Sequence, residues 1–493
     1  MTAKDASIVL LAAGKGTRMR SDLAKVLHRA GGRSLVEHVI RVCQPLRPAQ
    51  LLVVVGHQAE EVSAVVTDLG AQTVLQQPQR GTGHAMQIAR RAIRRSAKFA
   101  LVVPGDAPLL RTETLAALLD THRRGEAAAT ILTAELDDPT DYGRVLRDSE
   151  GRVQAIVEEK SATPEQRGIR EVNSSIYCFT LAKLWPCLNS LRPENAHREL
   201  YLTDVIGLLR ERNERVLAYV APDPREILGC NTRSALADVD RIFRARKAVE
   251  LMDSGVTIYL PETVVIDPEV TAGPDTLVEP GVQLLGRTRI GARCKIQTGS
   301  VLHDARVDDD AAVGPHSILD SCRVGIKAEV GPFSRLRPGA DIRAGARVGN
   351  FVEVKNAVLH EGAKALHLTY LGDASIGSKA NIGAGTITCN YDGVAKHQTK
   401  IGNNVFIGSD TALVAPVKVG HGAYVAAGST ITEYVPADAL ALARGRQVNK
   451  PGWAASRRRE IARAAKAKPS KPVRKSSGRR KPRRRGKSKS SRR

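Results

Sequence analysis

The sequence is poor in aromatic residues, in organised cysteines and in long hydrophobic runs. Phe, Trp and Tyr make up 3% of the 493 residues. The seven cysteines are an odd number, scattered without a CxxC pair, which argues for reduced thiols and against disulfides or a zinc site. No stretch approaches the roughly 20 apolar residues of a membrane span, and the apolar run 8–13 is too short for a signal peptide. These absences predict a soluble, cytoplasmic protein.

The net charge of +24 would suit a nucleic-acid-binding protein, but it is concentrated at one end of the chain. Residues 457–493 contain 19 Lys and Arg and one acidic residue, so this tail alone carries +18. The rest of the chain carries +6, which is unremarkable for its length. The basic character therefore belongs to an appendage. The chain's 42% apolar content is enough for two or three cores in the remaining body.

The tail itself is rich in Lys, Arg, Ser and Pro and almost devoid of apolar residues beyond a few alanines. Because such a segment has too little apolar surface to bury a core, we expect residues 451–493 to be disordered. Two interpretations stay open. The tail is either a solvated extension without a partner, or it binds an acidic polymer such as RNA, or a membrane surface, by salt-dependent attraction.

Residues 7–143 alternate between apolar, strand-like segments and amphipathic, helix-like segments. Strands are expected at 7–13, 51–56, 73–77, 101–104 and 130–134, and helices at 34–43, 59–69, 83–95 and 112–124. This alternation predicts a parallel, doubly wound sheet. Ligands of such sheets bind at the carboxyl ends of the strands, so we looked for polar motifs there.

Glycine-rich motifs follow three of these strands. In the motif LAAGKGTRM at residues 11–19, Gly14 and Gly16 would let backbone N–H groups approach a phosphate, and Lys15, Arg18 and Lys25 add charge. The motif has neither the GK[ST] ending of a P-loop nor the third glycine of a dinucleotide fingerprint, so alone it also suits an ordinary glycine turn. The later motifs QQPQRGTGHA at 76–85 and PGDAPL at 104–109 favour a binding site, since the second puts a carboxylate where a phosphate-bound metal would lie.

A six-residue repeat of small aliphatic side chains runs from about Val264 to Ile431. Its unbroken part consists of Val324, Val330, Leu336, Ile342, Val348 and Val354. A period of six fits neither an α-helix nor an ordinary strand and predicts a parallel β-helix. A helix over residues 234–251, with a solvated charged face (Arg241, Arg244, Arg246 and Lys247), is expected to connect it to the preceding domain.

Two interruptions of the repeat are expected, at residues 356–374 and 388–400, and His, Asn and Tyr gather there. His367 is either a packed structural residue between leucines or a general base for an amine nucleophile. A three-histidine zinc site is a further alternative, and the spacing of the histidines argues against it. The histidines considered are His303, His316, His360, His367, His397 and His421.

These motifs resemble a known enzyme family over residues 7 to about 450. The N-terminal motifs are similar to those of sugar-phosphate nucleotidyltransferases, and more closely to the N-acetylglucosamine-1-phosphate uridyltransferase domain of a bifunctional bacterial family. ALHLTYLGD at 365–373, ANIGAGT at 380–386 and NYDG at 390–393 resemble the glucosamine-1-phosphate acetyltransferase domain of the same family. The resemblance implies a Rossmann-like domain (1–232), a linker helix (233–252), a left-handed parallel β-helix (253–450) and a basic tail (451–493). It also implies a homotrimer with an acetyltransferase site between subunits.

For the N-terminal half, the resemblance implies binding of UTP, a sugar phosphate and Mg²⁺. Arg18 and Lys25 would stabilise charge on the α-phosphate, and Asp106 and Asn231 would hold Mg²⁺. The residues implied for the nucleotide are Leu11, Ala12, Ala13, Gly14, Lys25, Gln76, Gly81 and Thr82; those for the sugar are Gly143, Glu158 and Asn173, with Asn231 at the same nucleotide-sugar site. The sugar phosphate would attack in line and pyrophosphate would leave, so positioning and charge neutralisation carry the rate.

The sequence departs from the family pattern at three places near this site. Ala24 and Ser34 stand where the family usually has proline. Ser174-Ser175 replace the usual Thr-Gly after Asn173. The first two departures concern loop stiffness, and the third concerns the sugar pocket.

For the C-terminal half, the resemblance implies that His367 is the base for the sugar 2-amino group. Arg337, Lys355, Tyr370 and Asn381 would position glucosamine-1-phosphate, Arg337 and Lys355 by meeting its phosphate. Asn390 and Tyr391 would serve both the sugar phosphate and acetyl-CoA. The remaining residues implied for acetyl-CoA are Ala384, Ser409, Ala427 and Arg444.

The resulting hypothesis is a bifunctional enzyme that acetylates glucosamine-1-phosphate with acetyl-CoA and then transfers UMP from UTP, making UDP-N-acetylglucosamine for peptidoglycan and cell-envelope synthesis. One alternative is a nucleotidyltransferase of another sugar with a regulatory β-helix. A second is a non-catalytic assembly subunit, which would be expected to lack site residues. Lys25, Asp106, Asn231 and His367 are all present, which favours the enzyme.

Overall fold

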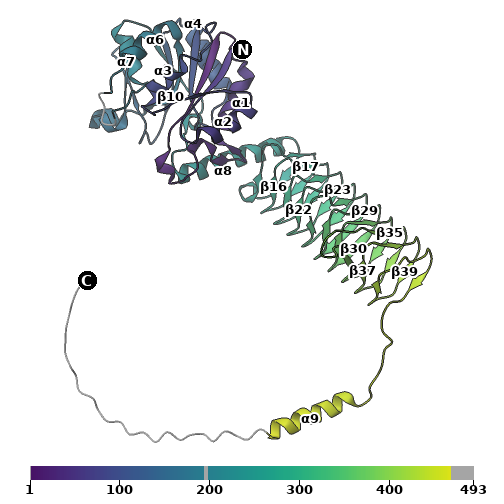
Figure 1. Ribbon diagram of the computed structural model, residues 1–493. Helices are drawn as coiled ribbons and strands as arrows, with labels where there is room; N and C mark the ends of the chain where they lie inside the picture. The colour runs from purple at the N-terminus through teal and green to yellow at the C-terminus, as the bar shows by residue number, and fades with distance from the viewer. Residues whose placement is uncertain (1, 194–197, 468–493) are drawn as a thin grey trace, which may run out of the picture. The chain divides into compact units, whose positions relative to one another are not determined.

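The computed structural model describes residues 2–193 and 198–467. The chain divides into two compact units, residues 1–443 and residues 444–493. The first unit contains an α/β domain, a long helix and a column of short strands (Figure 1). No helix within the described ranges combines the length and apolar character that crossing a bilayer requires.

The N-terminal domain is built on one twisted sheet whose central strands are parallel. The strand order is β11-β7-β10-β6-β1-β4-β5. These strands are β1 (Ala6–Ala12), β4 (Gln50–Val55), β5 (Gln72–Leu75), β6 (Phe99–Pro104), β7 (Ala129–Glu135), β10 (Glu171–Thr180) and β11 (Val216–Val220). A hairpin of β8 (Arg144–Arg147) and β9 (Val153–Val157) continues from β10, and β2 (Arg29–Ala30) pairs with β3 (Arg33–Ser34). The five strands expected from the sequence are all present.

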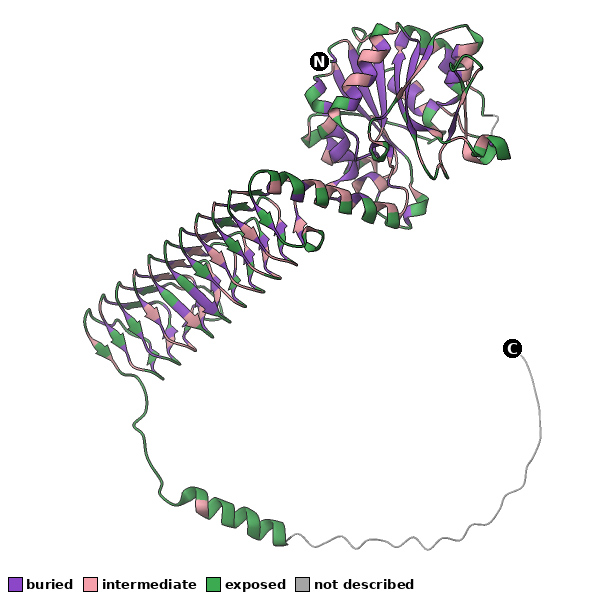
Figure 2. Cartoon of the chain, turned by 180° about the vertical axis from the view of Figure 1, so that it is seen from behind, coloured by how far each residue is buried: buried purple, intermediate pink, exposed green. Residues whose placement is uncertain are grey.

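Both faces of this sheet are covered by helices. Along β1, Ile8 and Leu10 belong to one hydrophobic core and Val9 to another, because successive side chains of a strand point to opposite faces. Helices α1, α2 and α4 contribute to the first core, and α3, α6 and α7 to the second. The helices are α1 (Leu35–Cys43), α2 (Ala59–Asp68), α3 (Thr82–Ala89), α4 (Thr112–Arg124), α5 (Pro164–Arg167), α6 (Leu181–Ser190) and α7 (Asp204–Glu211). Figure 2 shows the buried strands between these layers. The doubly wound arrangement is confirmed.

Two details of this domain differ from the prediction. The sheet is mixed, because β10 enters antiparallel between β6 and β7. Helix α3 ends at Ala89 and not near residue 95. The side chain of Gln50 accounts for this early end, since it accepts a hydrogen bond from Arg94 N (3.0 Å) and donates one to Ala92 O (2.9 Å), fixing a turn.

Ser34 begins helix α1 at a position where related sequences usually have proline. Its side chain accepts a hydrogen bond from Glu37 N (3.3 Å), and Glu37 returns one from its carboxylate to Ser34 N (3.4 Å). This reciprocal capping box satisfies two N–H groups that a helix start otherwise leaves unpaired. The departure from proline is therefore compensated locally.

The C-terminal part of the first unit is a parallel β-helix of three sheets. The first sheet contains β12 (Thr257–Ile258), β15 (Leu277–Val278), β18 (Lys295–Ile296), β21 (Ala312–Val313), β24 (Glu329–Val330), β27 (Arg347–Asn350), β30 (Lys364–His367), β33 (Asn381–Ile382), β36 (Phe406–Ile407), β39 (Tyr424–Val425) and β41 (Leu440–Ala441). The second contains β13 (Val265–Ile266), β16 (Gln283–Leu285), β19 (Val301–His303), β22 (Ile318–Asp320), β25 (Arg335–Leu336), β28 (Glu353–Lys355), β31 (Tyr370–Gly372), β34 (Ile387–Cys389), β37 (Ala412–Val414) and β40 (Thr430–Ile431). The third contains β14 (Thr271–Ala272), β17 (Arg289–Ile290), β20 (Arg306–Val307), β23 (Arg323–Val324), β26 (Asp341–Ile342), β29 (Val358–Leu359), β32 (Ala374–Ile376), β35 (Thr399–Ile401) and β38 (Val417–Val419).

The six-residue repeat forms the interior of this β-helix, as predicted. The aliphatic side chains from Val324 to Val354 in that repeat are each at most 1% exposed and belong to one continuous core. Strands of successive coils pair in parallel at an offset of 17 or 18 residues, as in Val313 with Val330 and Val330 with Val348. Three hexapeptides therefore make one coil.

Only one of the two predicted interruptions is a true insertion. Residues 356–374 continue the coils, since Val358 pairs with Asp341 and Tyr370 with Glu353 at the normal offset of 17. The offset rises to 25 where Asn381 pairs with Phe406, because residues 390–398 leave the coil as a loop. The polar residues at 356–374 therefore lie on an undisturbed scaffold.

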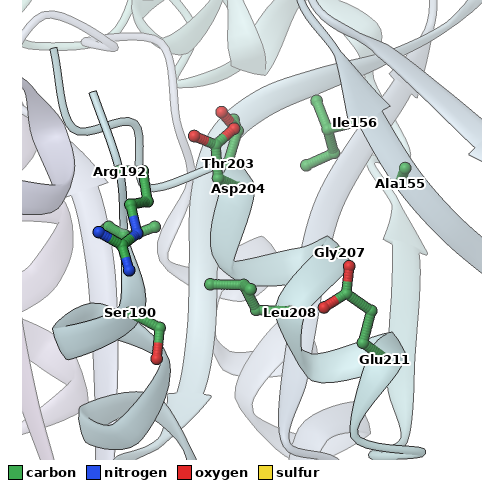
Figure 3. A pocket seen from close by; sticks show the side chains of 10 residues that line it. Ala155, Ile156, Ser190, Arg192, Thr203, Asp204, Gly207, Leu208 and Glu211 are labelled. Atoms are coloured by element: carbon green, nitrogen blue, oxygen red, sulfur yellow. The ribbon is translucent and has the colours of Figure 1, made fainter. Parts of the chain in front are cut away.

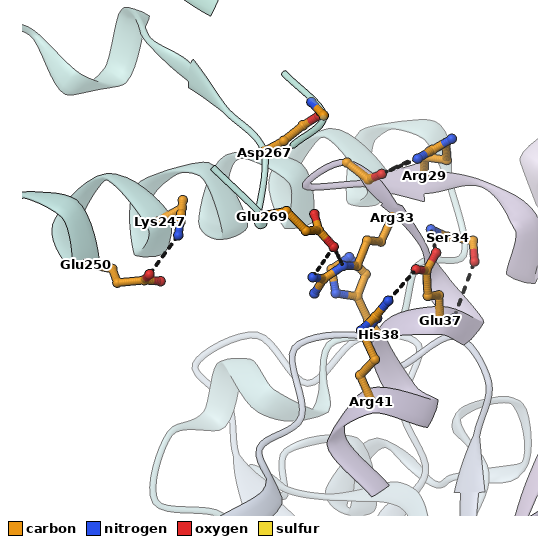
Figure 4. A network of polar contacts seen from close by, with 12 residues as sticks. Arg29, Arg33, Ser34, Glu37, His38, Arg41, Lys247, Glu250, Asp267 and Glu269 are labelled. Carbon is orange, nitrogen blue, oxygen red and sulfur yellow. Dashed lines mark hydrogen bonds and ion pairs between the residues drawn. The ribbon is translucent and has the colours of Figure 1, made fainter. Parts of the chain in front are cut away.

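Helix α8 (Arg233–Asp253) joins the two parts, and its contacts correct a prediction. The ring of Phe243 stacks on His38 of α1 at a centroid distance of 4.0 Å. Arg244 forms an ion pair with Asp267 at 2.5 Å, and Arg246 donates to Leu109 O at 3.3 Å. Three of the four basic residues expected to be solvated are thus engaged: Arg244, Arg246 and Lys247, which pairs with Glu250. Arg33 of the β2–β3 hairpin pairs with Glu269 at the same junction (Figure 4).

Helix α9 (Trp453–Ala467) corrects the expectation that residues 451–493 are disordered throughout. Its sequence is dominated by Ala and Arg, which have high helix propensity, and Pro451 and Gly452 lie outside it. The expectation for residues 468–493 concerns residues outside the described part of the chain.

Candidate functional sites

A cavity of about 530 Å³ opens at the carboxyl ends of β1, β5 and β6. Nine residues implied for the nucleotide and the metal line it: Leu11, Ala12, Ala13, Gly14, Lys25, Gln76, Gly81, Thr82 and Asp106. Beside Gly14, a side chain would meet no protein atom within 4 Å, so this space is open to a ligand. At Gly81 the backbone has a φ of 98°, and a Cβ atom would lie 2.6 Å from Leu200 O, so the loop requires glycine there.

Gln76 is buried and partly used by the protein itself. Its Nε2 donates to Gly81 O at 3.0 Å and lies 3.1 Å from His84 Nδ1. These contacts fix the side chain across the mouth of the loop that precedes α3. They occupy the Nε2 group, so the carbonyl oxygen of Gln76 remains for a nucleobase edge.

Lys25 is the central cation of this cavity. Its ammonium group donates to the Asp106 carboxylate and to Asn231 Oδ1, the latter at 3.1 Å. The side chains of Lys25 and Asp106 are only 18% and 15% exposed, so the pair is partly shielded from water. The backbone joins the same groups, because Cys230 N donates to Asp106 O at 3.0 Å. Three residues far apart in sequence thus meet at one point.

Asp106 and Asn231 fit a magnesium ion. Both present oxygen atoms to one cation, the Lys25 ammonium, and oxygen atoms are the ligands that Mg²⁺ prefers. Mg²⁺ is commonly held by one or two protein oxygens together with substrate phosphates. Within the described residues, no group of three or more His, Cys, Asp or Glu side chains is arranged to hold a metal ion by itself.

The loop that carries Lys25 is held by a bond that proline could not make. Ala24 has a φ of −53°, which proline would accept, but its N–H donates to Gln58 Oε1 at 2.5 Å. The loss of proline stiffness at this position is therefore offset by a hydrogen bond to the start of α2.

The three residues implied for the sugar form a cluster beside the cavity. Asn173 N donates to Gly143 O at 2.8 Å, and a Cβ atom at Gly143 would lie 3.6 Å from Glu158 Oε2. Burial raises the pKa of Glu158, while a hydrogen bond from Thr203 (3.4 Å) opposes this shift. Asn173 Nδ2 donates to the Tyr177 hydroxyl at 2.8 Å, which fixes the amide.

Ser175 lines the main cavity in a strained conformation. Its φ is 63°, a left-handed value, and it lies in the bulge of β10 between Asn173 and Tyr177. Its N–H donates to Asn173 Oδ1 at 3.1 Å. The glycine usual in related sequences would adopt this φ without strain, so the substitution adds a side chain to the sugar side of the cavity at a conformational cost.

Other lining residues were missed by sequence reasoning, notably Gln79, Glu199 and Tyr201. Glu199 and Tyr201 come from a segment without a motif, and only the fold brings them to the cavity. Arg18, in contrast, does not line it. Its side chain is 59% exposed and lies 4.0 Å from the Asp141 carboxylate.

A second cavity, of about 410 Å³, lies between β9 and α7 (Figure 3). Thr203 lines it and also donates to Glu158. Its walls carry the carboxylates of Asp204 and Glu211 together with Arg192, and burial raises the pKa of Asp204. Two carboxylates do not suit an anionic phosphate, so the sugar nucleotide belongs in the larger cavity.

On the β-helix, basic side chains converge at the ends of the second-sheet strands. Arg337 and Lys355 follow equivalent positions of β25 and β28, and Arg337 donates to Glu353 at 2.8 Å. The Lys396 ammonium beside Lys355 lowers the pKa of Lys355, Arg337 adds to this effect, and Asp373 opposes it. Three neighbouring cations with one opposing carboxylate form a site suited to a phosphate. Lys396 was not expected from the sequence.

The inserted loop holds Lys396 in place. Asp392 accepts hydrogen bonds from Val394 N (2.8 Å), Ala395 N (2.7 Å) and His397 Nε2 (2.6 Å). These bonds keep the pKa of Asp392 well below its usual range. The hydroxyl of Tyr391 donates to Gly393 O at 2.6 Å.

Tyr370 and Asn390 meet above Gly372. A Cβ atom there would overlap the Tyr370 hydroxyl and lie 2.8 Å from Asn390 Nδ2. Asn390 Nδ2 also donates to Asp373 Oδ2 at 2.5 Å. The missing side chain of Gly372 therefore lets both polar groups approach Lys355, whose backbone pairs with Gly372 one coil earlier.

His367 and three acetyl-CoA residues occupy equivalent corners of successive coils. Register pairs His367 with Asn350, and the printed offsets of the next strands place Ala384, Ser409 and Ala427 above it in turn. Asp410 N donates to Ala384 O at 2.7 Å, and Gly428 N donates to Ser409 O at 2.8 Å, which links these corners. His367 is exposed and is not a packed core residue. Asn381 precedes this corner on β33, and Arg444 belongs to the second unit.

Comparison with known proteins agrees with both halves. The profile of the MobA-like NTP transferase domain matches residues 8–174, and that of the bacterial transferase hexapeptide (six repeats) matches residues 398–433. Proteins named Bifunctional protein GlmU are similar along nearly the whole chain. The Koribacter versatilis protein is 48% identical over 458 residues, covering 92% of this chain and 97% of its own length. The Solibacter usitatus protein is 49% identical over 454 residues, with the same coverage, and the Streptomyces avermitilis protein is 46% identical over 468 residues, covering 94% and 97%.

The fold and the two sites together define a nucleotidyltransferase joined to a hexapeptide-repeat acyltransferase. At this level of identity over nearly the full length, the chain belongs to the bifunctional GlmU family. It is an enzyme with acetyltransferase and uridyltransferase activities in UDP-N-acetylglucosamine synthesis.

Proposed function

We propose that each activity resides in its own domain, with residues 1–232 performing uridyl transfer and residues 253–450 performing acetyl transfer. The linker helix over 233–252 joins them and the basic segment 451–493 follows. The observation that carries the N-terminal assignment is the convergence of Lys25, Asp106 and Asn231 at a cavity lined by the nucleotide motifs.

In the uridyl site, UTP lies with its phosphates along the loop from Leu11 to Gly14, whose backbone is open to the cavity. Lys25 neutralises charge on the α-phosphate as the sugar phosphate attacks in line, and exposed Arg18 approaches from solvent. Asp106 and Asn231 hold Mg²⁺, which screens phosphate charge when bound. The cluster of Gly143, Glu158 and Asn173 orients the sugar.

In the acetyl site, glucosamine-1-phosphate places its phosphate among Arg337, Lys355 and Lys396. His367 accepts a proton from the 2-amino group as nitrogen attacks the thioester carbon, the carbon–sulfur bond breaks, and CoA leaves as the thiol. An imidazole suits this task near neutral pH. Tyr370, Asn381, Asn390 and Tyr391 position the sugar, and acetyl-CoA lies along the corners at Ala384, Ser409 and Ala427, with Arg444 as a further contact.

We also propose that the active form is a homotrimer. Phe333 stacks on Phe351 at 5.6 Å, and both are about half exposed, at 47% and 60%. Leu368, which follows His367, continues this apolar ladder at 63% exposure. An exposed apolar ladder beside the corner of His367 suits a subunit contact that completes the acetyl site. Because UTP and acetyl-CoA are intracellular co-substrates, the enzyme works in the cytoplasm.

Two single variants test the division of labour. His367→Ala should abolish CoA release from glucosamine-1-phosphate and acetyl-CoA and leave uridyl transfer intact. Asp106→Asn should do the reverse. A mixture of the two variants should again convert glucosamine-1-phosphate to UDP-N-acetylglucosamine, because the acetylated intermediate diffuses between molecules. If either variant loses both activities while remaining folded, the assignment to separate sites is wrong.

A further inference from the structure

Helix α9 presents large apolar side chains to solvent on one side. Trp453 and Ile461 are 61% and 57% exposed. At about 100° per residue, Trp453, Ala454, Ile461, Ala464 and Ala465 fall within an arc of about 120°. A helix with no packed core beside it does not need such an arc.

The opposite side of the same helix is basic. Arg458, Arg459, Arg463 and Lys466 fall on the complementary arc. The single acidic residue, Glu460, is paired with Arg457 at 3.0 Å, which draws Arg457 to the edge of the apolar arc. By sequence, residues 468–493 add 14 Lys and Arg and no acidic residue.

We propose that α9 and the basic segment after it bind an anionic lipid surface, with α9 lying in the interface. A helix with Trp and Ile on one side, Arg and Lys on the other, and low overall hydrophobicity is typical of interfacial membrane helices. Trp favours the headgroup region, and clustered basic residues are attracted to anionic lipids. This proposal concerns neither catalytic site.

Lipid is favoured over nucleic acid by the apolar arc. The basic residues alone would suit a phosphate backbone, but RNA binding leaves exposed Trp453 and Ile461 without a consistent partner along one face. A lipid interface satisfies both sides of the helix at once. The charge of the following residues then sets a preference for acidic headgroups and a strong salt dependence.

The test uses the full-length protein and sedimentation with two kinds of vesicle, phosphatidylcholine alone and phosphatidylcholine with 30% phosphatidylglycerol. Binding to the anionic vesicles only, weakening with added salt, is expected. Trp453→Ser/Ile461→Ser should weaken it at least tenfold, since two large side chains no longer leave water. The matched control Ala455→Ser/Ala462→Ser, on the basic arc, should bind as the parent does. All variants should retain both enzyme activities, which verifies folding.

Fluorescence adds a direct readout, because the chain has two tryptophans. In a Trp185→Phe background, the emission of Trp453 should shift to shorter wavelength on anionic vesicles. Three outcomes would overturn the proposal: equal binding by the apolar double variant and the parent, binding to single-stranded RNA without binding to vesicles, or binding to none of these probes.

Discussion

The stacked histidine at the junction of α1 and α8 makes the N-terminal domain sensitive to acid. His38 is 5% exposed, stacks on Phe243 with an interplanar angle of 12°, and its Nε2 lies 2.8 Å from Ala30 O. Burial lowers the pKa of His38 to about 4; Arg33 and Arg41 act in the same direction, and the bond to Ala30 and the charge of Glu37 oppose them. His38 is therefore neutral in the folded protein throughout the neutral range.

The sign and size of the effect follow from linkage. Below about pH 6.5 the unfolded chain takes up a proton at this histidine that the folded chain does not, so stability is fully present above pH 6.5 and falls as the pH drops toward 4. At pH 5 the loss from this one residue is about 2 kcal/mol. His122, whose pKa burial also lowers to about 4, adds a separate loss of the same sign.

The test compares urea unfolding of the parent and His38→Phe at pH 7.5 and pH 5. In a Trp453→Phe background, Trp185 reports on the N-terminal domain alone. The variant keeps a ring against Phe243 but loses the bond to Ala30, so it should be about 1 kcal/mol less stable at pH 7.5. It should then lose about 2 kcal/mol less than the parent on moving to pH 5.

His57→Gln is the matched control, because it removes a partly exposed histidine from the same domain. It should show the parent's full loss between the two pH values. An equal loss in His38→Phe and the parent would refute the reasoning, since the contribution of His122 is common to both proteins and cancels in the comparison.

Three further predictions concern the two sites. Lys396→Met should raise the KM for glucosamine-1-phosphate about tenfold, because one of three cations at the phosphate is lost, while uridyl transfer is unchanged; an unaltered KM would remove Lys396 from the site. Ser175→Gly should raise the free energy of unfolding by about 1 kcal/mol in urea, because a left-handed φ no longer carries a side chain, and a decrease would contradict the strain argument. Gln58→Ala should cost about 1 kcal/mol in the parent but little in an Ala24→Pro background, where the N–H bonded to Gln58 is absent; equal costs in both would argue against that bond.

Local patterns carried much of the fold. The strands and helices of the N-terminal sheet were predicted from alternating apolar runs, because each pattern reflects which faces of a segment leave water. The aliphatic repeat through Val330 and Val348 predicted the β-helix for the same reason. Helix α9 was missed because its residues lack an apolar core to join, and composition alone does not reveal a helix that depends on local propensity.

Motif spacing predicted which residue types matter, and tertiary structure decided where they meet. Lys25, Asp106 and Asn231 lie on separate loops, and only the sheet order and the bond from Cys230 to Asp106 bring them together. Lys396 has no motif of its own and reaches Lys355 because an inserted loop is braced by Asp392.

The amino-acid sequence by itself determined the two domain types, the six-residue period and the identity of most site residues, since these depend on chemistry within a few neighbouring positions. The coil register decided the rest. Offsets of 17, 18 and 25 residues align His367 with Ala384, Ser409 and Ala427, and they show that residues 356–374 are regular coil and not an interruption. Such alignment depends on how many residues close each turn of the helix, a property of the whole coil that no single motif contains.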